Sequence, residues 1–341
     1  MSDADSRYSR QIRFQPIGEE GQKRISTARV LICGCGALGS VLAERLARSG
    51  VGQLTLVDRD WVEKSNLQRQ TLFTEEDALE ARPKAVAAAE ALSRINSEIQ
   101  IESRVEDIHF DSLPTLAANC DLIVDGTDNF ETRFLINDFS IKHRVPWVHG
   151  GCLGAGGQGM VVLPGQSSCF RCLVPDLPSR EHMETCDSAG VLGSAIGLVA
   201  SWQAGEALKI LSGNTASVTN GLWVMDSWNN DYRVLQLNQN PNCPCCVHGE
   251  YPFLNGEIRS QTTVLCGKNA VQIDVPTSQK SSLSDIAERV AELGDVKQNA
   301  YFVRVATRDH TITVFRGGRT VVEGTTDESE AKSVATRILG G

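Results

Sequence analysis

The 341-residue sequence lacks the hallmarks of membrane and secreted proteins. It has no run of about 18 apolar residues, the length a membrane-spanning helix needs, and no apolar segment near its N-terminus that would indicate a signal peptide. It also lacks a basic excess: 33 Lys and Arg stand against 42 Asp and Glu, a net charge of −9. An acidic balance argues against nucleic acid as a general partner. We therefore expect a cytoplasmic protein with no membrane or nucleic-acid partner, and we find no internal repeat or low-complexity segment.

The length and a hydrophobic content of 41% predict two domains, or one large domain with an appendage. We place the boundary between residues 1–255 and 256–341. Eleven cysteines in a cytoplasmic chain favour metal binding or catalysis over disulfides.

A glycine motif organises the first domain. Val30–Cys33 is a short apolar run typical of a buried parallel strand. Gly34, Gly36 and Gly39 then form G-x-G-x-x-G, followed by a helix with an apolar stripe and a second strand that ends at Asp58. The glycines permit a tight turn, the approach of N–H groups to a phosphate, and close helix packing, while the acid can bind ribose. This order predicts a nucleotide site on a Rossmann-like, doubly wound α/β sheet, with NAD as the default from this stretch alone.

The polar loop after this unit contains further candidates. Asp60 follows closely, and Asn66, Arg69 and Gln70 cluster in an apparent loop. An arginine fork beside a nucleotide suits phosphate oxygens, although the loop can also be read as a simple polar connection. Lys84 lies in the first turn of the next predicted helix, where a cation opposes the helix dipole. This mismatch indicates a nearby anion, although an exposed lysine also tolerates such a position.

Two later segments lie at the expected carboxyl edge of the sheet. Asp128 follows a predicted strand at 121–125 and precedes a helix at 130–142. It can bind Mg²⁺ or cap that helix, and the local sequence leaves both roles open. The stretch 150–159 contains six glycines, which predicts a passage where another backbone comes close.

The remaining cysteines include two C-x-x-C pairs, Cys169 with Cys172 and Cys243 with Cys246. Four thiolates in two such pairs suit a closed, structural tetrahedral Zn²⁺ site, with a redox pair as the competing interpretation. Cys186 precedes a long predicted helix at about 193–211, where a thiol pKa can be depressed. It reads equally well as a nucleophile or as a surface thiol.

Residues 256–341 predict a small α+β domain in the order β-α-β-β-β-α. A single strand is expected across TTVLCGKNAVQI, and we see no catalytic constellation in this part of the chain.

The motifs together point to a family. RYSRQ, GCGALG, LVDRD, SNLQRQ, DGTDN, CFRC, ETCDSAGV and NPNCPCC occur in that order. Over about residues 5–250 the chain closely resembles the MoeB/ThiF/HesA group, the bacterial relatives of ubiquitin-activating enzymes. The resemblance implies that the glycine motif binds ATP rather than NAD. It also implies a nucleotidyltransferase that adenylates the C-terminal glycine of a ubiquitin-like sulfur carrier with a diglycine end and releases pyrophosphate, ahead of thiocarboxylate formation.

The resemblance also assigns roles to single residues. Asp58 would hold the ribose beside Asp60, Asn66 and Arg69 would hold the triphosphate together with Lys84, and Asp128 would position Mg²⁺.

Other roles carried over by resemblance lie outside the nucleotide pocket. Arg10, which alone reads as a solvated arginine, would reach into the nucleotide site of a second subunit and so implies a homodimer. The two C-x-x-C pairs match zinc ligands. Cys186 matches a cysteine that some members use for a thioester or disulfide-linked carrier intermediate.

The C-terminal domain departs from part of the family because it lacks a rhodanese-type loop. Sulfur would then come from a separate donor. The domain would bind carrier or donor, or stabilise the dimer. Three alternatives to carrier adenylation are a tRNA-modifying relative, a non-catalytic nucleotide-binding scaffold and, more distantly, an NAD-dependent dehydrogenase. The sequence does not distinguish thiamine from molybdopterin biosynthesis.

Overall fold

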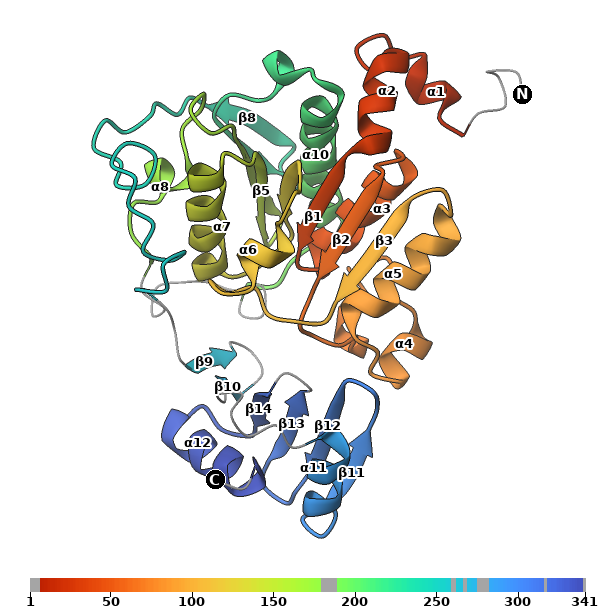
Figure 1. Cartoon of the computed structure of the whole chain (residues 1–341), viewed down its shortest axis with the longest axis vertical. Coiled ribbons are helices and arrows are strands. Elements are labelled where there is room, and N and C mark those ends of the chain that lie inside the picture. Colours follow the sequence, from red (N-terminus) through yellow and green to blue (C-terminus); the bar gives the residue numbers. More distant parts are fainter. Residues whose placement is uncertain are drawn as a thin grey trace. The chain divides into compact units, whose positions relative to one another are not determined.

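The chain divides into two compact units, residues 1–258 and 259–341. The computed structural model describes residues 7–178, 189–258, 262–265, 269–274, 282–315 and 318–339. Each unit has its own sheet and is considered separately below (Figure 1).

The first unit is built on an eight-stranded sheet in the order β3-β2-β1-β4-β5-β6-β7-β8. The first five strands in sequence pair in parallel, and β6, β7 and β8 extend the sheet antiparallel. The strands are β1 (Arg29–Cys33), β2 (Gln53–Val57), β3 (Gln100–Arg104), β4 (Leu122–Asp125), β5 (Trp147–Leu153), β6 (Gly156–Val162), β7 (Leu222–Asp226) and β8 (Asp231–Leu235). The predicted Rossmann-like doubly wound sheet is confirmed.

Helices cover both faces of this sheet (Figure 1). They are α1 (Ser9–Ile12), α2 (Gly18–Thr27), α3 (Ala37–Arg48), η2 (Lys64–Asn66), α4 (Glu75–Leu79), α5 (Lys84–Ile95), α6 (Leu113–Leu116), α7 (Phe130–His143), α8 (Phe170–Leu173), α10 (Gly193–Ser212) and η4 (Thr215–Ser217). One apolar core joins α3, α5 and α10 to one face, and a second joins α6, α7 and α8 to the other. Alternate strand residues therefore point into different cores, as in other α/β sheets buried on both sides.

The strand order reverses between β1 and β4, and glycines let the chain close up there. Gly34 has φ +86°, a left-handed conformation that favours glycine. A Cβ on Gly39 would lie 1.8 Å from the Gly34 carbonyl oxygen, and one on Gly126 would lie 2.7 Å from the same oxygen. The first and third glycines of the motif therefore let α3 and the turn after β4 pack against the end of β1. Open α/β sheets bind ligands at such a reversal.

The glycine-rich stretch 150–159 forms strands, which the sequence analysis did not predict. It ends β5 and begins β6. Cβ atoms on Gly150, Gly157 and Gly159 would lie within 2.3 Å of side chains of α10. On that face the glycines make room for helix side chains, so the expected approach of another backbone is wrong there.

The second unit has a six-stranded antiparallel sheet in the order β11-β12-β13-β14-β10-β9. Its elements are β9 (Thr262–Leu265), β10 (Ala270–Asp274), α11 (Leu283–Val290), β11 (Asp295–Gln298), β12 (Phe302–Ala306), β13 (Thr311–Phe315), β14 (Arg319–Glu323) and α12 (Glu328–Leu339). Both helices share one apolar core with the sheet. The α+β class is as expected, but the predicted succession β-α-β-β-β-α is wrong, because two strands precede the first helix and four follow it in the described residues. The segment TTVLCGKNAVQI, predicted to be one strand, forms the β9–β10 pair, and Asn269 has φ +44° directly before β10. The second missed strand is β11, whose sequence has too little alternation of apolar and polar residues to predict a strand.

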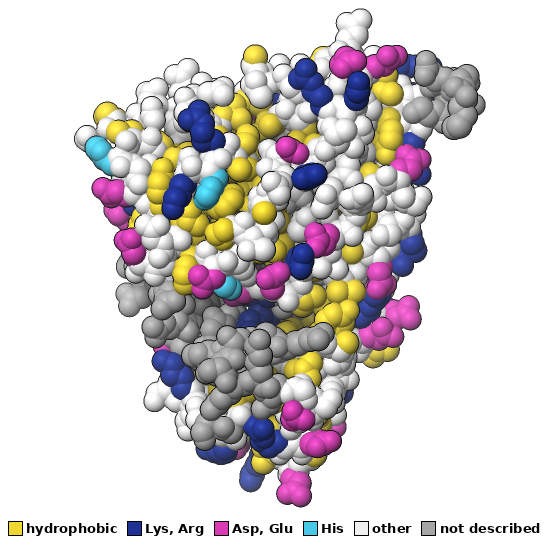
Figure 2. Space-filling view, in the orientation of Figure 1, with side chains coloured by type: hydrophobic (Ala, Val, Ile, Leu, Met, Phe, Trp, Pro, Cys, Tyr) yellow, Lys and Arg dark blue, Asp and Glu magenta, His cyan; other side chains and the backbone are white. Residues whose placement is uncertain are grey.

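Acidic and basic side chains are interspersed on the face seen in Figure 2. None of the helices in the described ranges is long and apolar enough to cross a membrane.

Candidate active site

The glycine turn after β1 is tied directly to the end of β2. Asp58 accepts hydrogen bonds from the backbone N–H of Cys35 at 2.7 Å and from that of Asp60 at 2.7 Å. Gly36 has space around it, because the nearest atom to a Cβ there would be Nε2 of Gln70 at 3.9 Å. The motif therefore leaves its middle glycine accessible at the start of α3, where free N–H groups favour an anion.

Lys84 is buried among carboxylates at this edge. The backbone N–H of Lys84 donates to the Asp60 carbonyl at 2.8 Å, and its Nζ lies 3.6 Å from Oδ2 of Asp60. Burial lowers the pKa of Lys84, but the charges of Asp60, Asp58 and Asp128 outweigh that effect and leave the pKa raised. Burial raises the pKa of Asp58, opposed by the charge of Lys84. The ammonium therefore stays charged beside the glycine turn, although its helix position is unfavourable.

Arg59, which the sequence did not single out, lies in the same group of charged residues. Its Nη1 lies 2.8 Å from Oδ2 of Asp107, and its Nε lies 4.0 Å from Oδ1 of Asp60. Burial lowers the pKa of Arg59, but the charges of Asp107 and Asp60, and more weakly that of Asp128, outweigh this effect. The pKa of Arg59 is therefore raised overall. Arg59 lies within the LVDRD motif, but nothing in the sequence singled it out or indicated Asp107 as its partner.

Asp128 is exposed in the turn between β4 and α7. The cap of α7 is its neighbour Asn129, whose side chain accepts from the N–H of Glu131 at 2.9 Å. The alternative in which Asp128 caps the helix is therefore wrong, and its carboxylate is available at the carboxyl edge near Lys84.

The loop at 64–70 lies beside the glycine turn and the start of α10. Asn66 is buried and its Oδ1 accepts from the N–H of Glu63 at 3.0 Å, while Nη1 of Arg69 donates to the Ser65 carbonyl at 2.9 Å. Gln70 is also buried, and its Oε1 has no hydrogen-bond partner among the described residues. Nε2 of Gln70 is the atom that lies nearest to a Cβ at Gly36. Gln70 is therefore a third polar side chain that this loop contributes, besides Asn66 and Arg69.

Arg10 lies elsewhere in its own subunit. The neighbouring Gln11 donates to the Ser49 carbonyl at 3.0 Å, just after the C-terminus of α3. Tyr8 packs on Gly50 there and accepts from Asn96 at 2.8 Å. Because α3 begins at the glycine turn and spans 12 residues, these anchors are about 18 Å from that turn. The structure therefore does not bring Arg10 to the nucleotide residues of the same chain.

The two C-x-x-C pairs meet in space. The sulfur atoms of Cys169, Cys172, Cys243 and Cys246 all lie within 4.8 Å of one another. The sulfur of Cys172 is 3.5 Å from that of Cys246, and the sulfur of Cys169 is 3.6 Å from that of Cys243 and 3.9 Å from that of Cys172. A tetrahedral zinc with Zn–S bonds of about 2.3 Å requires sulfur separations of about 3.8 Å. Cys245 is not one of the four, although its thiol interacts with that of Cys169, and its sulfur accepts from Nδ2 of Asn137 at 3.2 Å. The cluster is compatible with zinc and joins α8 to the turn at 243–246. Cys186 lies outside the described residues.

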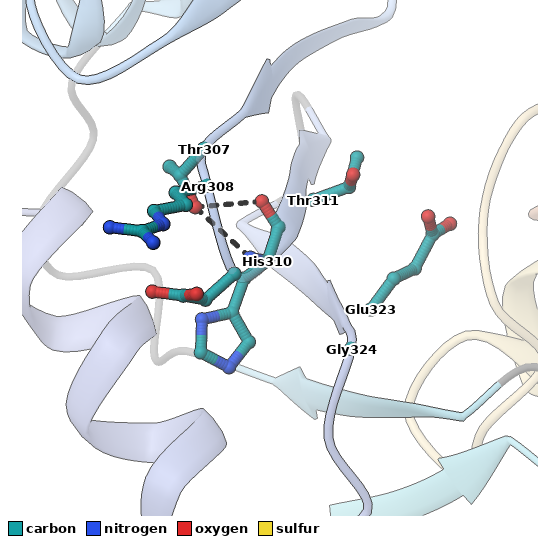
Figure 3. A pocket seen from close by; sticks show the side chains of 7 residues that line it. Thr307, Arg308, His310, Thr311, Glu323 and Gly324 are labelled. Atoms are coloured by element: carbon teal, nitrogen blue, oxygen red, sulfur yellow. Dashed lines mark hydrogen bonds between the residues drawn. The ribbon is translucent and has the colours of Figure 1, made fainter.

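A separate cavity of about 180 Å³ lies in the C-terminal unit (Figure 3). Thr307, Arg308, His310 and Glu323 line it, and the Thr307 hydroxyl bonds the backbone of His310 at 2.8 and 3.1 Å. Charges of both signs line this cavity. Across the described part of the chain, only the cysteine cluster brings three or more metal-ligating side chains together.

Comparisons with known proteins show the family of the chain. A family model described as the ThiF family matches residues 8–245. A relative from Bacillus subtilis, named sulfur carrier protein ThiS adenylyltransferase, is 39% identical over 338 residues, which cover 98% of this chain and 99% of the relative. The chain belongs to the ThiF family. The resemblance identified from the motifs is thus confirmed.

Two further relatives match about seven-tenths of the chain. A protein of the same name from Escherichia coli is 39% identical over 248 residues, covering 72% of this chain and 97% of the relative. The SAMP-activating enzyme E1 of Haloferax volcanii is 36% identical over 243 residues, covering 71% of this chain and 89% of the relative.

Among solved structures, Escherichia coli MccB with ATP matches with a TM-score of 0.63 and 22% sequence identity. The match covers 72% of this chain and 75% of that chain, and it supports the fold.

Proposed function

We propose that this protein is an ATP-dependent adenylyltransferase that activates the C-terminal glycine carboxylate of a ubiquitin-like sulfur carrier. The observation that carries the proposal is the buried Lys84, which lies 3.6 Å from Asp60 and is also influenced by the charge of Asp58 at the glycine turn, with Asp128 exposed on the adjoining turn. The names of the Bacillus subtilis and Escherichia coli relatives supply the substrate class.

The reaction needs charge neutralisation more than acid–base catalysis. A carrier carboxylate oxygen attacks the α-phosphorus of ATP, a P–O bond forms, and the bond to pyrophosphate breaks. Because a carboxylate is already ionised, no proton has to be removed from the nucleophile. Lys84, Arg69 and Arg59 can offset the negative charge that gathers as the anions meet. Asp58 can accept hydrogen bonds from the ribose.

Asp128 fits the Mg²⁺ role proposed for it. Mg²⁺ is usually held by one or two carboxylates together with substrate phosphates, and Asp128 presents one free carboxylate beside the proposed phosphate site. When bound, the ion would neutralise phosphate charge.

The carrier tail would pass beside β5 and β6. Gly154 has no atom within 4 Å of a Cβ position, and the nearest atoms at Gly151 and Gly156 are at 3.5 Å. These glycines therefore leave room on the side where α10 does not pack, which suits a narrow diglycine tail. A bulky residue at Gly151 or Gly156 is expected to impair carrier use more than ATP binding, and unchanged carrier kinetics would refute this path.

A homodimer would complete the site. Because Arg10 is anchored at the far end of α3, it would serve the nucleotide site of a second copy rather than its own. The same arginine is exposed, as such a role requires.

Other parts of the proposal concern cofactors and partners. Zn²⁺ would hold the four-cysteine cluster closed and take no part in the chemistry, because four thiolates leave no open position. Cys186 would form any covalent link to the carrier. Sulfur would come from a separate donor in the cytoplasm, and the C-terminal unit would bind carrier or donor, or stabilise the dimer.

Intact-mass spectrometry tests the proposal. Protein, Mg²⁺, ATP and a diglycine-ended carrier are mixed with pyrophosphatase, and the carrier should gain the mass of one AMP. A carrier without its last glycine is the control and should gain nothing. If no carrier among those tested gains AMP although ATP binds, the adenylation proposal is wrong.

A further inference from the structure

A buried polar network underlies the turn that carries Asp128. Asp125 at the end of β4, His149 in β5 and Gln203 in α10 are fully buried, and Arg133 in α7 is 7% exposed. None of the four is among the residues singled out from the sequence. Buried charged groups are uncommon unless they are paired, so the group calls for an explanation.

The Asp125 carboxylate is fully satisfied. Its Oδ1 accepts from the N–H and the hydroxyl of Thr127, at 2.8 and 2.7 Å. Its Oδ2 accepts from Nε of Arg133 at 3.2 Å and lies 2.8 Å from Nδ1 of His149. Four partners use the acceptor sites of an ionised carboxylate, which fixes both the carboxylate and Thr127.

The guanidinium of Arg133 ties three points together. Besides Asp125, its Nη2 donates to the Thr127 carbonyl at 2.6 Å and to the Gly150 carbonyl at 3.4 Å. It therefore bonds the turn directly before Asp128 and the middle of β5. Only a planar fork can make these contacts at once, since an ammonium at that position is a single point charge.

We propose that Arg133 is a positioning residue, which holds the turn at Thr127 so that the adjacent Asp128 can bind Mg²⁺ with ATP. The inference rests on the proposed function, because it presumes the Mg²⁺ role of Asp128. Partners that orient metal ligands typically change metal affinity or activity by about 10- to 100-fold when removed.

The measurement is the Mg²⁺ enhancement of ATP binding. Isothermal titration calorimetry gives the Kd for ATP in the presence of EDTA and in the presence of Mg²⁺, for the full-length protein and its variants. The Mg²⁺ ratio is the first of these Kd values divided by the second. Asp128→Asn should reduce this ratio toward one. Arg133→Lys should reduce it about tenfold. In the Asp128→Asn background, Arg133→Lys should change the ratio by less than about twofold, because both act through one ligand.

Two further variants separate positioning from general loss of stability. Phe134→Leu alters the next residue of α7, which packs on Phe170 and Phe253 and points away from the turn. It should lower the melting temperature and leave the Mg²⁺ ratio unchanged. Thr127→Val removes the hydroxyl bond to Asp125 and should reduce the ratio about threefold even if Arg133→Lys does not fold.

The outcomes distinguish the inference from the proposed function. If Asp128→Asn leaves the ratio unchanged, the Mg²⁺ role in the proposed function is wrong. If Asp128→Asn abolishes the enhancement while Arg133→Lys and Thr127→Val keep the wild-type ratio, the positioning role is wrong. An equal effect of Arg133→Lys in both backgrounds would also overturn it.

Discussion

At the scale of single residues, the site is built from groups whose partners come from distant parts of the chain. The motif letters indicated Asp58, Lys84 and Asp128, because each stands at a strand end or helix start. They did not indicate Arg133 or His149, because a buried polar network depends on which strands become neighbours. Asn129 illustrates the difference: the sequence left the cap of α7 open, and the structure assigns it to this residue.

His149 gives a prediction about pH. Burial lowers its pKa below the ordinary 6.5, more than the hydrogen bond to Asp125 raises it, so the folded protein holds a neutral ring. The unfolded chain takes up a proton first as pH falls. Stability is therefore complete above about pH 6.5 and decreases below it, by at most about 1.4 kcal/mol per pH unit until the folded pKa is reached.

His149→Asn keeps a donor at the Nδ1 position and removes the titration. Urea unfolding at pH 7.5 and 5.5 should show a smaller loss of stability for this variant than for wild type. The exposed His109 provides the control, and His109→Asn should lose as much as wild type. Equal pH dependence in all three proteins would contradict the assigned neutral state.

At the scale of elements, glycines determine how closely helices pack on the sheet, and cysteines join a short helix to a distant turn. The strand–turn–helix order around the first glycine motif was predictable, because glycine turn, apolar stripe and acid lie close together in the sequence. The β5–β6 pair was not, since its glycines weaken every local strand signal and the reason for them is the distant helix α10.

Two neighbouring glycines of β6 give a matched test of this packing. A Cβ on Gly157 would lie 2.3 Å from Cγ2 of Val199 and 2.7 Å from Cε of Met225, whereas one on Gly156 would meet nothing closer than 3.5 Å. Gly157→Ala should lower the free energy of unfolding by about 1–3 kcal/mol, and Gly156→Ala should change it by less than about 0.5 kcal/mol. Urea titration of both variants measures this. Equal stabilities would mean that α10 does not pack closely on that strand.

The cysteine cluster gives a test of metal removal. Its four thiols join α8 to the turn at 243–246 and border the second apolar core. Cys243→Ser should lose one equivalent of zinc and about 3 kcal/mol or more of unfolding free energy, because metal binding contributes to folding. Cys245→Ser should keep its zinc, since that sulfur is not one of the four grouped thiols and accepts a hydrogen bond from Asn137. Metal analysis and urea unfolding provide the readouts, and zinc retention by Cys243→Ser would exclude it as a ligand.

At the scale of the whole molecule, the account requires that two chains share each site. Arg10→Ala and Lys84→Ala should each be nearly inactive alone. When they are unfolded together and refolded as a mixture, half of the dimers are mixed and each has one site with both native residues. The mixture should therefore recover about a quarter of wild-type activity. If Arg10 acted within its own chain, no site would be restored and the mixture would stay inactive.

The measurement that tests the central claim most directly is carrier-dependent exchange of labelled pyrophosphate into ATP. Wild type and Asp128→Ala would be compared with a panel of diglycine-ended carriers. The account predicts exchange that depends on one carrier and is lost in Asp128→Ala, which would also name the substrate. ATP binding without exchange for every carrier would contradict adenylation of a carrier tail and would favour a scaffold or an RNA substrate.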